Sequence, residues 1–103
     1  MTTPFVLQDG AADDLRSIVR YTRKTWGEVQ ARAYSETLHT GIQRLVNGQG
    51  TYKILEDIHP ALRITRCEHH YIFCLCREDA PSLIVAILHE RMDLIARITD
   101  RLD

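Results

Sequence analysis

The sequence has no apolar run long enough to cross a membrane, since a spanning helix needs about 18 or more consecutive apolar residues. It also lacks internal repeats and low-complexity stretches. The chain has 103 residues, of which 45% are hydrophobic and 26% are charged, and this composition is ordinary for a globular fold. It excludes a disordered tail, a collagen-like chain and a small domain held together by disulfides. We therefore predict a single domain over residues 1–103.

A secretory signal is also missing, because Met1-Thr2-Thr3-Pro4 offers neither a basic start nor a long apolar stretch. We therefore expect a cytoplasmic protein. The chain has only three cysteines, Cys67, Cys74 and Cys76, and this odd number in a cytoplasmic chain predicts reduced thiols rather than disulfides. Cys74 and Cys76 would share one face of a strand and are expected to be small buried hydrophobes.

A metal site would have to combine Cys67 with His69 and His70, and the sequence holds no second ligand pair at a zinc-site spacing. We therefore expect neither a metal nor a cofactor. No excess of positive charge is present either, because 13 Lys and Arg face 14 Asp and Glu. Nucleic-acid binders are usually clearly basic, so we expect no sequence-specific nucleic-acid binding, although 11 of the 13 cations are arginines that could form a local patch.

Apolar residues at helical spacing predict two amphipathic helices in the first half of the chain. The first is expected over residues 11–25, with Asp9 as its cap and Gly27 as its end. The second is expected over residues 28–46 and ends at Asn47-Gly48. Two such helices separated by one glycine indicate an antiparallel helical hairpin.

The second half changes to apolar runs that are typical of strands. Residues 49–61 are the least regular part and are expected to form a loop, because Pro60 opposes a helix there. The chain is expected to end in a short helix capped by Asp93. The predicted strands are residues 4–7, 62–67, 71–76 and 82–88.

The short links between the last three strands make neighbouring strands antiparallel, while the place of the first strand stays undetermined. The predicted fold class is therefore α+β, with an N-terminal strand and an antiparallel helical hairpin packed on an antiparallel sheet. The short C-terminal helix closes this domain.

Several short motifs follow one another in a fixed order along nearly the whole chain. They are Ala11-x-x-Asp14-Leu15-x-x-Ile18-x-x-Tyr21, Trp26-Gly27-x-x-Gln30-Ala31-x-x-Tyr34, Leu62-Arg63, His70-x-Ile72-Phe73 and Ile87-Leu88-His89-x-Arg91-Met92-Asp93. Each motif is weak alone, but their order and spacing together resemble the ParE-type toxins of the RelE/ParE superfamily.

The resemblance implies the toxin of a type II toxin–antitoxin system, of the kind linked to plasmid stability. Its partner would be a cognate antitoxin, a ParD- or PaaA-like peptide whose C-terminal segment wraps around the toxin in a hetero-oligomer. ParE-type toxins poison DNA gyrase, here expected through the gyrase A subunit, whereas RelE-type toxins cut messenger RNA on the ribosome. Because the two types share a fold, only the chemistry of the site can separate them.

Cutting RNA requires groups that move protons and stabilise the phosphate. Arg66 matches the sheet arginine of the superfamily, and His89 and Arg91 follow the last strand, where other members carry basic residues. RelE-type toxins usually add a late aromatic hydroxyl, yet residues 92–103 contain no tyrosine. We therefore predict a gyrase inhibitor that is not an enzyme. An RNA endonuclease and a non-toxic relative that only binds antitoxin remain as alternatives.

A protein that acts by binding needs exposed anchor residues, among which arginine and aromatic side chains are favoured. No catalytic residue is assigned. The antitoxin is expected to lie across the groove between hairpin and sheet or to add a strand to an open edge. The residues predicted to bind the target, together with the tail helix, are Arg63, Arg66, His89, Arg91 and Met92.

Several histidines and aromatic residues could instead have a purely structural role. His89 can form a local hydrogen bond at the end of a strand, and His69-His70 can form a hairpin bend or pair with Glu68. Trp26 and Tyr34 are expected to lie in the core of the helical hairpin rather than to contact a partner.

Overall fold

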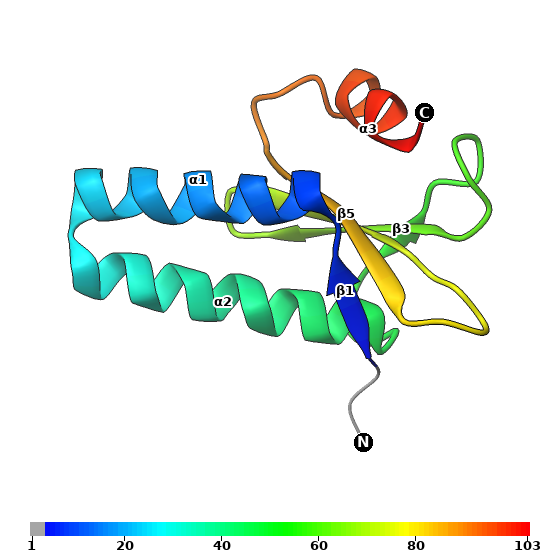
Figure 1. The fold of residues 1–103 in the computed structure, drawn as a ribbon, viewed down its shortest axis with the longest axis horizontal. Coiled ribbons are helices and arrows are strands. Elements are labelled where there is room, and N and C mark those ends of the chain that lie inside the picture. The colour runs from blue at the N-terminus through cyan, green and yellow to red at the C-terminus, as the bar shows by residue number, and fades with distance from the viewer. Residues whose placement is uncertain (1–3) are drawn as a thin grey trace.

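The computed structural model describes residues 4–103, so residues 1–3, which carry most of the prediction about a secretory signal, lie outside the described residues. None of the helices in the described part is long and apolar enough to cross a membrane. Figure 1 shows the elements in chain order: β1 (Phe5–Leu7), α1 (Asp9–Trp26), α2 (Glu28–Val46), β2 (Lys53–Ile54), β3 (Leu62–Cys67), β4 (His70–Leu75), β5 (Ser82–His89) and α3 (Leu94–Leu102).

The strands form one five-stranded sheet in the order β1-β5-β4-β3-β2. The predicted antiparallel meander of β3, β4 and β5 is confirmed. The sheet is mixed rather than wholly antiparallel, because β1 pairs in parallel with β5. The expectation of a plain loop over residues 49–61 is wrong, since β2 pairs with β3 there. A two-residue strand is too short to leave a period-2 pattern that a sequence could reveal.

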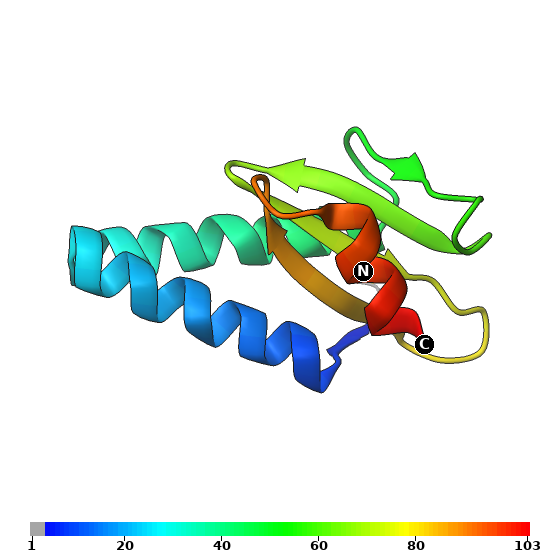
Figure 2. The same cartoon turned by 90° about the horizontal axis from the view of Figure 1, so that it is seen from above.

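The sheet separates two hydrophobic clusters. The first lies between the sheet and the helical hairpin and includes Leu38 of α2 and Ile72 of β4. The second lies on the other face and includes Phe73 of β4 and Ile98 of α3. Figure 2 shows the hairpin and α3 on different sides of the strands. The predicted packing of a hairpin on one face is confirmed, and α3 closes the opposite face.

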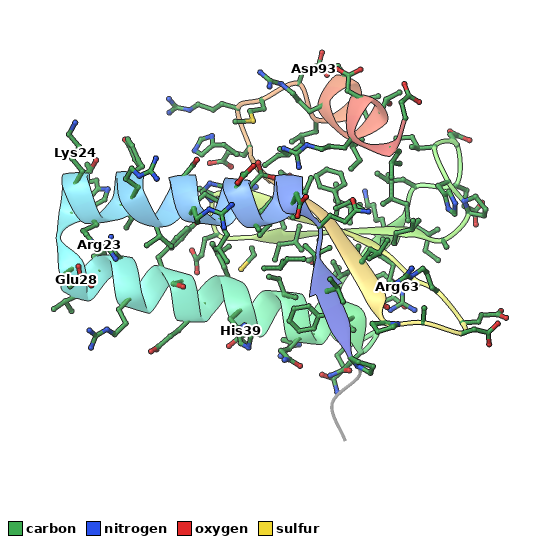
Figure 3. The ribbon with its side chains drawn as sticks, viewed as in Figure 1. Arg23, Lys24, Glu28, His39, Arg63 and Asp93 are labelled. Atoms are coloured by element: carbon green, nitrogen blue, oxygen red, sulfur yellow. The ribbon has the colours of Figure 1, made fainter. Side chains whose placement is uncertain are left out.

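The helical hairpin turns at a single glycine. Gly27 has φ 95°, a left-handed conformation that costs glycine little, and its N–H donates to the carbonyl of Arg23. Arg23 also pairs with Glu28 across the turn at 2.6 Å, and these two side chains face each other in Figure 3. The first helix begins two residues earlier than predicted, so Asp9 is its first residue and Gln8 takes the cap position.

The C-terminal helix α3 is fixed to the rest of the fold at both ends. Asp93 caps it as predicted, because its carboxylate accepts from the backbone N–H of Ala96 at 3.3 Å. At the other end, Arg101 pairs with Asp14 of α1 at 2.8 Å. Gly10 leaves room for this arginine, since a Cβ there would lie 2.8 Å from a guanidinium nitrogen.

Candidate functional site

The helical hairpin projects beyond the end of the sheet (Figure 1). Side chains from the projecting part and from the nearby ends of the strands enclose a cavity of about 1000 Å³. We call this cavity the hairpin groove. The lining residues that matter below are Tyr21, Trp26, Tyr34, His70, His89 and Arg91.

Two aromatic side chains of the hairpin groove are exposed to solvent. Tyr21 is 67% exposed and Trp26 is 70% exposed. The expectation that Trp26 lies in the hairpin core is therefore wrong. An α-helix of 18 residues is about 27 Å long, whereas a strand of six residues covers about 20 Å. The end of α1 therefore has no strand beneath it, and its aromatic residues remain open.

The floor of the hairpin groove is polar. The hydroxyl of Tyr34 lies 2.6 Å from Nδ1 of His70 and accepts a hydrogen bond from the backbone N–H of His69 at 3.4 Å. Tyr34 is half-buried and packs against the first hydrophobic cluster, which agrees with its expected place in the hairpin core, while its hydroxyl reaches the groove. The ring of His70 meets that of His89 edge to face, with centroids 5.1 Å apart. These contacts tie α2 to the ends of β4 and β5.

Burial lowers the pKa of His70 from its ordinary value of 6.5 to about 4, and the charges of His89 and His69 act in the same direction. The unfolded chain therefore binds a proton below about pH 6.5 that the folded protein takes up only near pH 4. We expect the free energy of unfolding to fall as the pH falls across this window. Below about pH 4 this contribution stops changing.

Urea titrations between about pH 7 and about pH 4.5 will measure this effect. The control is His70→Gln, whose amide oxygen still accepts from Tyr34 and whose side chain does not titrate. The natural protein should lose stability more steeply than this variant as the pH falls. Parallel curves for the two proteins would contradict the assignment to His70.

The predicted site residues do not all meet in one place. His89 and Arg91 both line the hairpin groove, and the predicted local bond of His89 is confirmed, since its Nδ1 accepts from the backbone N–H of Arg91 at 3.2 Å. Met92 is exposed but is not among the residues that line this groove. The tail helix lies on the other face of the sheet, against the second hydrophobic cluster.

Arg66 lies on the face of the sheet opposite the hairpin. It pairs in register with Tyr71, which packs on the second hydrophobic cluster. Its guanidinium binds Glu90 at 2.6 Å and donates to the carbonyl of Glu68 at 3.0 Å. Glu90 also contacts His69 at 2.9 Å, so His69 pairs with Glu90 and not with Glu68. The hydrogen bond from His69, with the charge of Arg66, lowers the pKa of Glu90.

Arg63 lies at the far end of the sheet from the hairpin turn (Figure 3). Its guanidinium donates to the carbonyl of Leu45 at 2.9 Å and to that of Val46 at 3.4 Å, and it stacks on the ring of Tyr52. These contacts satisfy the C-terminal carbonyls of α2. The structure thus gives Arg63 a local role and does not bring it together with His89 and Arg91.

The three cysteines are free thiols, as predicted. Cys74 is buried in the first hydrophobic cluster and Cys76 packs against it, which confirms that they share a face. Burial raises the pKa of Cys74 to about 12 and also raises that of Cys67, so both thiols stay protonated and unreactive. Within residues 4–103, no group of three or more His, Cys, Asp or Glu side chains could hold a metal ion.

Sequence reasoning missed the groove-lining roles of Tyr21, Trp26 and His70. The position of the two aromatic residues in the last turns before Gly27 could have indicated this role. A helical hairpin that is longer than its sheet leaves the residues near its turn uncovered. The role of His70 left no such signal, because it depends on contacts with Tyr34 and His89, which are distant in the chain.

Comparison with known proteins agrees with the resemblance seen in the sequence. The chain is 54% identical to "Toxin ParE" of Escherichia coli over 100 residues, which cover 97% of both chains. It is 27% identical to "Toxin ParE1" of Mycobacterium tuberculosis over 94 residues, which cover 91% of this chain and 96% of that one. A solved structure titled "Chromosomal ParDE TA system from P. aeruginosa" shares the fold, with a TM-score of 0.69 at 18% identity over 85% of this chain and 96% of that chain.

A model of a protein family also matches this chain, in agreement with these relatives. The model described as "ParE toxin of type II toxin-antitoxin system, parDE" matches residues 5–94, from β1 to the start of α3. This range contains both helices of the hairpin and every strand of the sheet. The chain belongs to the ParE family of toxins from type II toxin–antitoxin systems.

Proposed function

We propose that this ParE toxin inhibits DNA gyrase by binding the gyrase A subunit through the hairpin groove, without covalent chemistry. The observation that carries the proposal is the exposure of Tyr21 and Trp26 within a cavity of about 1000 Å³. Large aromatic side chains in a concave surface are the residues that dominate the energy of protein interfaces. His89 and Arg91 remain the proposed polar contacts of this surface.

The arrangement of the basic residues favours binding over RNA cleavage. A nuclease must place its phosphate-binding and proton-transferring groups around one scissile bond. Arg66 is turned to the opposite face from His89 and is neutralised by Glu90. Arg63 is engaged with the end of α2. The two histidines and Arg91 are thus separated from the other predicted cations.

We further propose that a ParD- or PaaA-like antitoxin neutralises the toxin by covering the same groove in a cytoplasmic hetero-oligomer. The name of the solved neighbour, a ParDE system, supports an antitoxin as the partner. The groove suits an amphipathic segment, because it combines exposed aromatic side chains with a polar floor. Both edges of the sheet are short, with three residues in β1 and two in β2, which makes strand addition the weaker option.

Supercoiling of relaxed plasmid by purified gyrase is the test of this proposal. We expect the protein to block supercoiling or to stabilise the gyrase–DNA cleavage complex, and its antitoxin to restore activity. Cleavage of messages in a translating extract should be assayed beside it. Cut messages with unaffected gyrase would favour the RelE-type nuclease. The third alternative is a non-toxic relative that only binds antitoxin. It would be favoured if supercoiling and messages were unaffected and cells grew normally when expression of the protein was induced.

A further inference from the structure

The floor of the hairpin groove presents hydrogen-bond donors, and the contacts of His70 show why. The hydroxyl of Tyr34 accepts from the backbone N–H of His69 at 3.4 Å and lies 2.6 Å from Nδ1 of His70. We assign the tautomer in which Tyr34 uses its own proton to donate to this nitrogen. A neutral imidazole carries one proton, which must then lie on Nε2. The burial of His70 keeps the ring neutral at ordinary pH.

His89 has its proton on the same atom for a different reason. Its Nδ1 accepts from the backbone N–H of Arg91 at 3.2 Å, so Nε2 is the protonated nitrogen. Within residues 4–103, neither Nε2 atom has a hydrogen-bond partner, and no fully buried side-chain nitrogen or oxygen lacks one. Both Nε2–H groups therefore keep contact with solvent, and both rings line the hairpin groove.

Arg91 adds a positive charge beside these donors. Its side chain is exposed, lines the same groove and forms no ion pair with any residue of the described chain. The carboxylate of the neighbouring residue Glu90 is already paired with Arg66 and His69. The groove thus combines two neutral N–H donors with one unpaired guanidinium.

We propose that the hairpin groove contains a carboxylate subsite, formed by Nε2–H of His70, Nε2–H of His89 and the guanidinium of Arg91. Its ligand is the side chain of an Asp or Glu in a partner protein. Tyr21 and Trp26 then receive an apolar or aromatic residue next to that acidic side chain. This inference rests on the proposed function, because it assumes that the groove is the surface a partner occupies.

The chemistry selects a carboxylate over its neutral isostere. A carboxylate accepts from all three groups and pairs with the charge of Arg91, whereas an amide has one accepting atom and no charge to pair with Arg91. Glu68 also lines the groove, and its negative charge repels the carboxylate of a ligand. The positive charge of the unpaired Arg91 offsets this repulsion. Removing that charge should therefore weaken the binding of a carboxylate and leave the affinity for an amide unchanged.

Nuclear magnetic resonance of the full chain tests the proposal with two blocked dipeptides, acetyl-Trp-Glu-amide and acetyl-Trp-Gln-amide. The probes differ only in the carboxylate. We expect the Glu probe to shift the Nε2 resonances of both histidines and to bind at least about five-fold more tightly than the Gln probe. Equal affinities, or shifts that leave both histidines unmoved, would overturn the subsite.

A matched pair of variants locates the charge. Arg91→Gln should remove most of the preference for the Glu probe, whereas Arg97→Gln, an exposed arginine of α3, should preserve it. Preference for acetyl-Trp-Gln with a free C-terminus over the Glu probe would assign the site to a terminal carboxylate and overturn the proposal as stated. These titrations contain neither gyrase nor antitoxin, so their result is independent of the supercoiling assay. The carboxylate subsite can be confirmed even if the protein does not inhibit gyrase, and it can be refuted even if the protein does.

Discussion

Replacing Asp14 by alanine is expected to lower the free energy of unfolding by about 3 kcal/mol, a large part of the stability of a small domain. The side chain of Asp14 is only 16% exposed. Its Oδ2 accepts from the backbone N–H of Ile87 at 2.9 Å, and the carboxylate binds both terminal nitrogens of Arg101 at 2.8 and 3.0 Å. Alanine would leave the amide and the guanidinium without their acceptor.

The contact with Asp14 also raises the pKa of Arg101, so the arginine is fully charged when the pair forms. Arg101 donates in addition to the carbonyl of Val85 at 2.9 Å, which connects α1, β5 and α3 through one guanidinium. Loss of the carboxylate therefore weakens the attachment of α3 to β5 as well as the attachment of α1 to β5. Urea denaturation followed by circular dichroism measures the change in the midpoint.

The matched control is Asp13→Ala on the preceding residue. Asp13 pairs with Arg16 on the surface, where the two side chains are 70% and 64% exposed. Exposed pairs contribute little, so this variant should change the free energy of unfolding by less than about 0.5 kcal/mol. Similar losses in the two variants would show that the start of α1 is sensitive to any charge removal, and would contradict the role given to Asp14.

The elements with strong local patterns could be predicted from the sequence. The bounds of α2 and β3 agree with the expected ranges, because residues 28–46 and 62–67 carry periodic apolar positions and clear end signals. The parallel pairing of β1 could not be predicted. A strand of three residues joins the sheet through contacts with β5, nearly eighty residues away, and these leave no local signal.

The site was harder to predict than the fold, for a physical reason. Arg66 and His89 were grouped because both are basic and close to strand ends, but alternation along β3 turns Arg66 to the opposite face. Asp14 was recognised only as part of a motif, since its partner Arg101 lies 87 residues further along the chain. Charge and exposure depend on tertiary neighbours, whereas helix and strand periods are local.

The exposed aromatic residues lead to the prediction with the largest effect on binding. Trp26→Ala is expected to weaken the complex with the cognate antitoxin at least about 30-fold, which corresponds to about 2 kcal/mol. A tryptophan that stands 70% exposed in a concave groove loses the most water contact when a partner covers it. The fold itself should change little, because this side chain contributes little burial in the free toxin.

Isothermal titration with the cognate antitoxin provides the measurement, and Ile95→Ala is the control. Ile95 is also an exposed apolar residue, at 57%, but it lies on α3 rather than in the hairpin groove. Its replacement should leave the affinity within about two-fold. An equal loss in both variants, or a larger loss for Ile95→Ala, would place the partner on the α3 side of the sheet. A loss confined to Trp26→Ala would mean that the uncovered tip of the hairpin is the surface that the partner recognises.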